Sequence, residues 1–94
     1  MVLTGVYMTS LPKRKQNLAW RKIEDEVVII DLDKGRQFHE LNDSGSRIWE
    51  LCDGETSVDD IASALTEDFE LDLPEAHKEV TEFITYLTEK DLLT

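Results

Sequence analysis

The sequence is poor in the residue types from which most catalytic sites are built. Its 94 residues include one cysteine, two histidines and four glycines. A single cysteine excludes a disulfide within the chain, and no glycine-rich stretch matches a phosphate-binding loop. The two histidines, His39 and His77, have no third ligand at close spacing and do not form a recognisable metal site. We therefore predict a protein that is not an enzyme and that binds no cofactor and no metal.

Long apolar runs and an N-terminal signal are also missing. No apolar stretch approaches the roughly 20 residues of a membrane-spanning helix. Near the N-terminus, polar residues and a glycine interrupt the apolar ones, and the first charges follow this stretch instead of preceding it. A secretory signal has the opposite order. We therefore expect a cytoplasmic protein with no membrane segment.

Basic residues are few, and half of them lie near the N-terminus. The formal net charge is −11, yet residues 1–22 contain five basic residues and no acid. Residues 23–94 contain five basic residues and all 21 acids, so that part carries −16. Such a body repels nucleic acid, and residues 57–69, a predicted helix, carry no Arg or Lys that could enter a DNA groove. The charge favours a peptide or protein partner with a basic or apolar surface.

Three apolar stretches separated by short turns occupy the middle of the chain. Residues 18–23 predict a strand, and the polar residues 24–26 predict a turn. Residues 27–32 are β-branched and apolar on both faces, which suits the middle strand of a small sheet. After a turn at 33–35, which contains a glycine, residues 36–41 predict a third strand. Short connections favour an antiparallel meander, which leaves the third strand at an edge.

Helix signals follow the strands. Asn42 or Asp43 can cap a helix over residues 44–52, which ends before Gly54. Cys52 falls on the apolar stripe of this helix and is interpreted as a buried structural thiol. A second predicted helix, residues 57–69, begins with a serine that is followed three residues later by an aspartate, a weak form of the capping box.

The third predicted helix begins at Pro74, a residue suited to a first helical turn. Its apolar residues recur at helical spacing and form one stripe: Ala76, Val80, Phe83, Ile84 and Leu87. The predicted fold is therefore α+β, a winged-helix-like βββααα arrangement over residues 18–94. Residues 1–17 are interpreted as a flexible basic tail, with an arm that straps onto a partner or onto the acidic body as the alternative.

One stretch is similar to another class of protein. The segment ALTEDFELDLPEA, residues 64–76, looks like the stretch that follows the prosthetic-group helix of acyl carrier proteins. That family needs Asp-Ser-Leu at the start of this helix, and residues 56–58 are Thr-Ser-Val instead. Three strands before the helices also have no place in a carrier. We therefore set this interpretation aside.

An ordered series of short motifs carries a wider resemblance. An aromatic on the third strand is followed by Leu-Asn, an Ile-Trp-x-Leu helix, an Asp-Gly stop, Thr-x-x-Asp/Glu-Ile and a final Leu-Leu. In this chain the series is Phe38, Leu41-Asn42, Ile48-Trp49-Glu50-Leu51, Asp53-Gly54, Thr56 through Ile61, which is one residue longer than the motif, and Leu92-Leu93. With this series, residues 18–94 resemble the PqqD-like family, the coenzyme PQQ synthesis protein D group.

The resemblance implies a function. Members of this family are non-catalytic chaperones that bind the leader of a ribosomal precursor peptide and present it to a modifying enzyme, a radical S-adenosylmethionine enzyme in the PQQ pathway. It also implies that the leader adds as a strand beside the third strand and against the third helix. An edge strand has the unpaired backbone groups that strand addition requires. The predicted peptide-binding residues are Arg36, Gln37, Phe38, His39, Glu40, Val80, Phe83, Ile84 and Leu87.

Two alternatives stay open at this point. The apolar residues of the third helix, and Phe38 on the third strand, can belong either to a peptide pocket or to ordinary core. The whole chain can also be an interaction or scaffolding subunit with a folded partner. In that case a weak homodimer through the same edge strand is an expected state.

Overall fold

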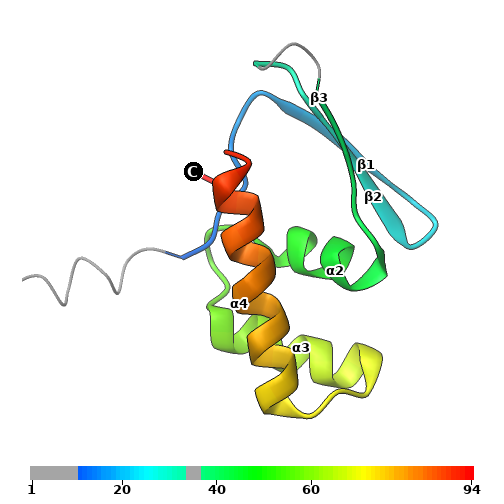
Figure 1. The fold of residues 1–94 in the computed structure, drawn as a ribbon, viewed down its shortest axis with the longest axis vertical. Helices are drawn as coiled ribbons and strands as arrows, with labels where there is room; N and C mark the ends of the chain where they lie inside the picture. Colours follow the sequence, from blue (N-terminus) through cyan, green and yellow to red (C-terminus); the bar gives the residue numbers. More distant parts are fainter. Residues whose placement is uncertain (1–10, 34–36) are drawn as a thin grey trace, which may run out of the picture.

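The computed structural model describes residues 11–33 and 37–94 and consists of a small sheet followed by three helices (Figure 1). The three strands form an antiparallel sheet in the order β1-β2-β3, with bounds Leu18–Ile23, Glu26–Asp31 and Gln37–Glu40. The helices are α2 (Asp43–Leu51), α3 (Val58–Phe69) and α4 (Leu73–Glu89). The predicted α+β class and the βββααα order are confirmed.

β2 lies in the middle of the sheet, but only one of its two apolar faces is fully covered. Val27 and Ile29 are fully buried, whereas Val28 and Ile30 are half-buried. The pairing is continuous from Leu18 opposite Asp31 to Ile23 opposite Glu26, which are joined by a tight turn. α2 packs on the face that carries Val27 and Ile29, α3 and α4 pack on α2 and on each other, and no described helix covers the opposite face.

Each helix begins at a polar side chain that accepts a hydrogen bond from its first turn. Of the two predicted caps of α2, Asn42 accepts from the Gly45 amide at 2.8 Å. Ser57 and Asp72 accept in the same way at the starts of α3 and α4, at 3.1 and 3.2 Å. These caps satisfy amide groups that have no partner inside the helix. No helix within residues 11–33 and 37–94 has the length and hydrophobicity to cross a membrane.

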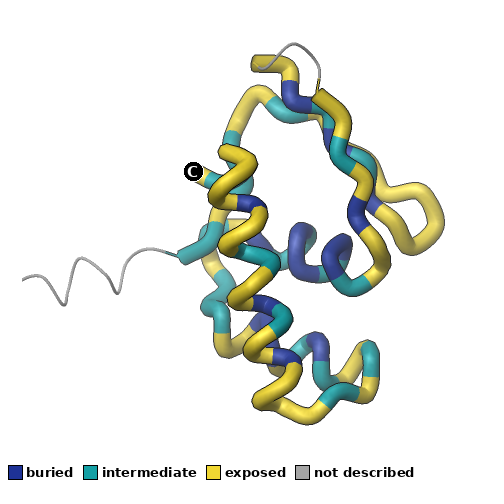
Figure 2. Tube along the Cα trace, in the orientation of Figure 1, coloured by how far each residue is buried: buried dark blue, intermediate teal, exposed yellow. Residues whose placement is uncertain are grey.

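The core lies between the inner face of the sheet and the three helices (Figure 2). Its largest fully buried side chains come from every layer: Trp49, Ile29, Ile48, Ile61, Leu65, Leu87 and Leu92. Cys52 belongs to this core, and burial raises the pKa of its thiol to about 12. The thiol is therefore protonated at neutral pH, which agrees with the structural role predicted for it.

Residues 11–17 run along the body of the domain. Arg14 donates from Nη1 to the carbonyl oxygens of Trp49 and Glu50, both at 2.9 Å, at the C-terminal end of α2. Its guanidinium also lies 5.1 Å from the centre of the Trp20 ring. A cation at this end of a helix satisfies free carbonyls and opposes the negative pole of the helix dipole.

Further contacts connect the same segment to the end of the chain. Lys15 forms ion pairs with the fully buried Asp31 at 3.5 Å and with Asp91 at 3.4 Å. The Gly54 amide donates to the Pro12 carbonyl at 2.8 Å. The first ten residues of the predicted tail lie outside the described residues. The boundary of the domain at residue 18 therefore stays a prediction, while residues 11–17 have the contacts of an arm on the acidic body.

Candidate functional site

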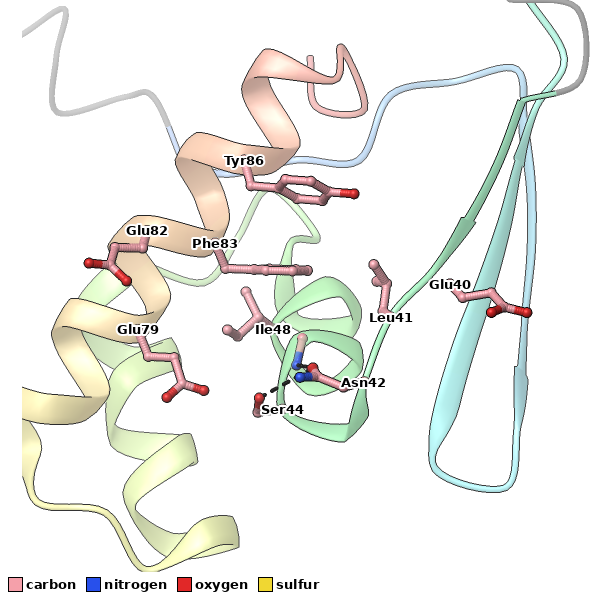
Figure 3. A pocket seen from close by; sticks show the side chains of 10 residues that line it. Glu40, Leu41, Asn42, Ser44, Ile48, Glu79, Glu82, Phe83 and Tyr86 are labelled. Atoms are coloured by element: carbon pink, nitrogen blue, oxygen red, sulfur yellow. Dashed lines mark hydrogen bonds between the residues drawn. The ribbon is translucent and has the colours of Figure 1, made fainter.

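A groove of about 480 Å³ separates the end of β3 and the start of α2 from α4 (Figure 3). It lies between the end of the third strand and the last helix, where the family resemblance implies a peptide cleft. Its lining residues are Glu40, Leu41, Asn42, Ser44, Gly45, Ile48, Glu79, Glu82, Phe83 and Tyr86.

The wall formed by β3 offers backbone groups. The Leu41 amide donates to the Val27 carbonyl at 2.9 Å, so Leu41 directs its hydrogen-bonding groups toward β2. In an antiparallel pair this orientation alternates along the strand. The N–H and C=O groups of His39 therefore also face β2, and those of Phe38 and Glu40 face away from it. Because β3 has no second neighbour in the described part of the sheet, these two residues have free backbone groups at its edge.

The opposite wall, on α4, offers aromatic side chains. Phe83 is half-buried, and its ring stacks with that of Tyr86 at a centroid distance of 5.5 Å. Figure 3 shows the Phe83 ring reaching from α4 over Ile48 of α2 toward Leu41. These four side chains give the groove an apolar floor.

Gly45 of α2 makes room for this arrangement. A Cβ atom at position 45 would lie 2.8 Å from Cζ of Phe83 and 3.0 Å from the capping oxygen of Asn42. Such distances are too short for carbon contacts, so a side chain here would displace the Phe83 ring. The glycine in the first turn of α2 therefore sets how deep the aromatic ring lies in the groove.

The rim of the groove is acidic. Glu79 and Glu82 project from α4, and no residue that lines the groove is basic. The Glu40 side chain points away from the groove (Figure 3). In the same view the Glu82 carboxylate lies on the other side of α4 from the Phe83 ring, whereas the Glu79 side chain points toward α2. The groove thus combines an apolar floor, two carboxylates on one side and a free strand edge on the other.

The predicted site residues fall into different environments. Phe83 lines the groove, and Ile84 is half-buried against the core. Val80 and Leu87 are fully buried, as in the alternative that assigned them to the core. Because their side chains have no exposed surface, they do not line the groove and instead pack in the core.

The predicted residues of the third strand also lie in different environments. Phe38 is 68% exposed and lies on the open face of the sheet, so its side chain is not in the groove. His39 faces the helices in register with Ile29, and its Nε2 atom is buried with no hydrogen-bond partner within the described residues. Gln37 is exposed at the start of β3, and Arg36 lies outside the described residues.

Several groove residues were not predicted. Leu41 and Ile48 appeared only in the series of motifs, and Gly45, Tyr86 and the two glutamates had no predicted role. A usable pattern was present, because positions 79, 82, 83 and 86 have the spacing of one helix face. That face meets β3, whereas the apolar stripe considered in the sequence is centred on the core.

The site has no arrangement typical of a metal centre. Within the described residues, no group of three or more potential metal ligands of the His, Cys, Asp and Glu types occurs. His77 lies on α4 and contacts Asp59 of α3, with Nε2 3.3 Å from the carboxylate oxygen. The polar side chains that line the groove carry carboxylates, one amide and hydroxyls.

The chain is similar to one protein family and to two solved structures. The family model for "Coenzyme PQQ synthesis protein D (PqqD)" matches residues 26–93. A solved structure of TbiB1 in complex with the TbiA(beta) leader peptide is 28% identical and has a TM-score of 0.77, over 86% of this chain and 93% of that one. A lasso peptide synthetase B1 complexed with its leader peptide shares the fold, at 20% identity and a TM-score of 0.76, over 87% of this chain and 95% of that one. No curated protein matches the chain.

Proposed function

Because this chain belongs to the PqqD family, we propose that it binds the leader of a ribosomally made precursor peptide and presents it to a modifying enzyme. The observation that carries the proposal is the groove, where the free edge of β3 faces the aromatic wall of α4. The two structural neighbours described above are complexes with leader peptides, which supports a ligand of the same kind.

The leader binds in this proposal as a fourth strand beside β3. Its backbone pairs with the outward-facing N–H and C=O groups of Phe38 and Glu40. Successive side chains of a strand point to opposite faces, so alternate leader residues enter the groove and the others lie on the open face of the sheet. The residues that enter the groove reach Phe83 and Tyr86.

Magnitudes indicate which part of the contact selects the leader. A backbone hydrogen bond contributes only about 0.5–1.5 kcal/mol net, and nearly any sequence can form it. Burial of one large apolar side chain contributes about 1.5–3 kcal/mol. An apolar or aromatic leader residue over Phe83 therefore distinguishes a leader from an arbitrary extended peptide.

Charge provides a second source of selectivity. Glu79 and Glu82 at the rim favour a leader with a basic residue next to the apolar one. Both carboxylates are close to solvent, and exposed ion pairs contribute about 0.2–1 kcal/mol each. The charge therefore biases the choice of leader, and the apolar contact determines whether binding occurs.

Presentation leaves the chemistry to the partner enzyme. The thiol of Cys52 is buried and protonated, and the groove is lined by carboxylates, the Asn42 side-chain amide, the Ser44 and Tyr86 hydroxyls and apolar groups. We accordingly propose a non-catalytic recognition element that resides in the cytoplasm, with a modifying enzyme of the radical S-adenosylmethionine type as the expected partner. The chain holds one end of the substrate while the enzyme acts on the other.

A titration followed by nuclear magnetic resonance tests the proposal. The probe, called the cognate leader, is a synthetic leader of a precursor peptide identified among the neighbouring genes, with the TbiA(beta) leader as a comparator and a scrambled leader as the control. We expect saturable amide shifts along residues 37–41 and on the groove face of α4 for the cognate leader alone. Shifts confined to other surfaces, or equal shifts with the scrambled peptide, would contradict leader recognition and favour a subunit that binds a folded partner.

A further inference from the structure

The open face of the sheet carries an apolar patch opposite to the helices. Phe38 is 68% exposed and Ile23 is 56% exposed, and they flank the half-buried Val28 and Ile30. Together with Ala19 these side chains line one shallow apolar surface. No described helix covers this surface, because all three lie on the other side of the sheet. An apolar patch of this kind on a small acidic protein indicates a contact surface.

The register of the strands orders this face into two rows across the sheet. In the first row, Ala19 of β1 lies opposite Ile30 of β2, which lies opposite Phe38 of β3. Partners that lie directly opposite each other in a ladder share one face. The first row therefore runs from a small side chain at β1 to a large one at β3.

The second row is graded in charge, as the first row is graded in side-chain size. Arg21 of β1 lies opposite Val28, which lies opposite Glu40 of β3. Glu40 points away from the groove, as Figure 3 shows, and therefore toward this open face. The second row thus runs from a positive side chain through an apolar centre to a negative one.

From these two rows we propose that the open face binds a second copy of this chain, face to face. A two-fold axis parallel to β2 and midway between two such sheets places β1 of one copy over β3 of the other. Arg21 then meets Glu40 of the second copy, and Ala19 meets Phe38, while Val28 and Ile30 each meet themselves. Both the charges and the sizes are complementary under this one rotation, which an isologous interface requires.

The area of the face limits the strength of this dimer. Three strands about 4.8 Å apart, with six residues of about 3.3 Å each, present roughly 300 Å² in plan. A stable specific interface buries about 800 Å² on each partner. We therefore expect a weak dimer that forms on the order of 100 µM.

This dimer differs from the edge-to-edge dimer expected from the sequence. The free backbone groups of β3 lie in the plane of the sheet, whereas the proposed contact lies above that plane. The groove and the strand edge therefore stay accessible in both copies. The inference goes beyond leader binding and does not depend on it.

Sedimentation equilibrium of the full chain, from about 5 µM to 1 mM to bracket this range, tests the proposal with charge reversals. Arg21→Glu and Glu40→Arg each place like charges opposite each other in a homodimer, so each variant alone should lose the wild-type self-association. An equimolar mixture of the two restores both opposite-charge contacts. We expect heterodimers to form about tenfold more tightly than either homodimer. Phe38→Glu should leave the protein monomeric throughout the range.

Lys22→Glu provides the matched control, because it makes the same charge change on the neighbouring residue of β1, whose side chain faces Glu50 of α2. This variant should dimerise like the wild type, and circular dichroism confirms that all variants are folded. A wild-type protein that is monomeric at 1 mM would overturn the proposal and leave the face to a different partner. A dimer that survives Phe38→Glu, or a mixture no tighter than its components, would overturn it equally.

Discussion

The two walls of the groove differ in what they offer a peptide. β3 is a strand of four residues, of which Glu40 lines the groove, and the outward-facing backbone groups of Phe38 and Glu40 lie along its edge. α4 is a helix of 17 residues whose backbone is internally bonded, and its contribution is a row of side chains. Backbone pairing along the strand is therefore open to any extended peptide, whereas the side chains of the helix select among peptide sequences.

The largest expected effect comes from the backbone of the strand. Glu40→Pro removes an outward N–H group, whereas Glu40→Ala keeps it and removes the same side chain. We expect the proline variant to bind the cognate leader at least about a hundredfold more weakly, because a lost donor and a distorted edge act together. Isothermal titration calorimetry provides the measurement, and circular dichroism checks the fold.

The alanine variant should bind within about twofold of the wild type, since an exposed side chain that points away from the groove contributes little. If both variants lose binding equally, the side chain of Glu40 matters and the assignment of β3 as a backbone wall is wrong.

The next effect comes from the aromatic wall. Phe83→Ala removes the ring that lies over Ile48, and we expect leader affinity to fall roughly ten- to a hundredfold through the lost apolar contact. The same calorimetric titration measures the change. Thr85→Ala, at an exposed position two residues away on α4, should leave affinity unchanged. Wild-type affinity in the Phe83 variant would mean that α4 does not select the leader.

A residue outside both walls separates stability from recognition. Arg14→Ala removes two hydrogen bonds to the end of α2 and the contact with Trp20. We expect the free energy of unfolding to fall by about 1–2 kcal/mol in urea denaturation. Leader affinity measured well below the unfolding transition should not change. A large loss of affinity in the folded variant would show that residues 11–17 take part in binding.

The smallest expected effect concerns the acidic rim. Glu82→Lys should weaken binding of a basic leader about three- to fivefold in low salt. The difference should shrink as the salt concentration rises, because exposed charges are screened over about 8 Å at physiological ionic strength. Fluorescence anisotropy at several salt concentrations measures this effect. Glu89→Lys makes the same charge change at the end of α4, away from the groove, and controls for net charge. Equal effects of the two substitutions would assign the salt dependence to overall charge.

Local patterns predicted the elements, and the family resemblance predicted a candidate site between the third strand and the third helix. Turn residues and β-branched runs placed the three strands within about one residue of their observed bounds, and serine and proline marked the starts of α3 and α4. These features depend on neighbours in the chain, so a sequence carries them. The edge position of β3 followed because short connections allow few other orders.

The division of the apolar side chains between core and groove could not be predicted in the same way. On α4, Val80 belongs to the core and Phe83 to the groove, although both are apolar and belong to one stripe. The division depends on where α2 and β3 contact the helix, which is a property of tertiary packing. Arg14 shows the same limit, since a basic cluster beside Pro12 predicts a tail, whereas the Arg14 side chain bonds to the end of α2.

Hydrogen exchange at single amides of β3 tests the central claim most directly. Strand addition predicts that the Phe38 and Glu40 amides exchange quickly in the free protein and become strongly protected when the cognate leader saturates the groove. The His39 amide, which already bonds to β2, should change much less and serves as the internal control. Protection of all three amides to the same extent would indicate general stabilisation by binding elsewhere. Unchanged exchange at Phe38 and Glu40 in the saturated complex would contradict strand addition at this edge.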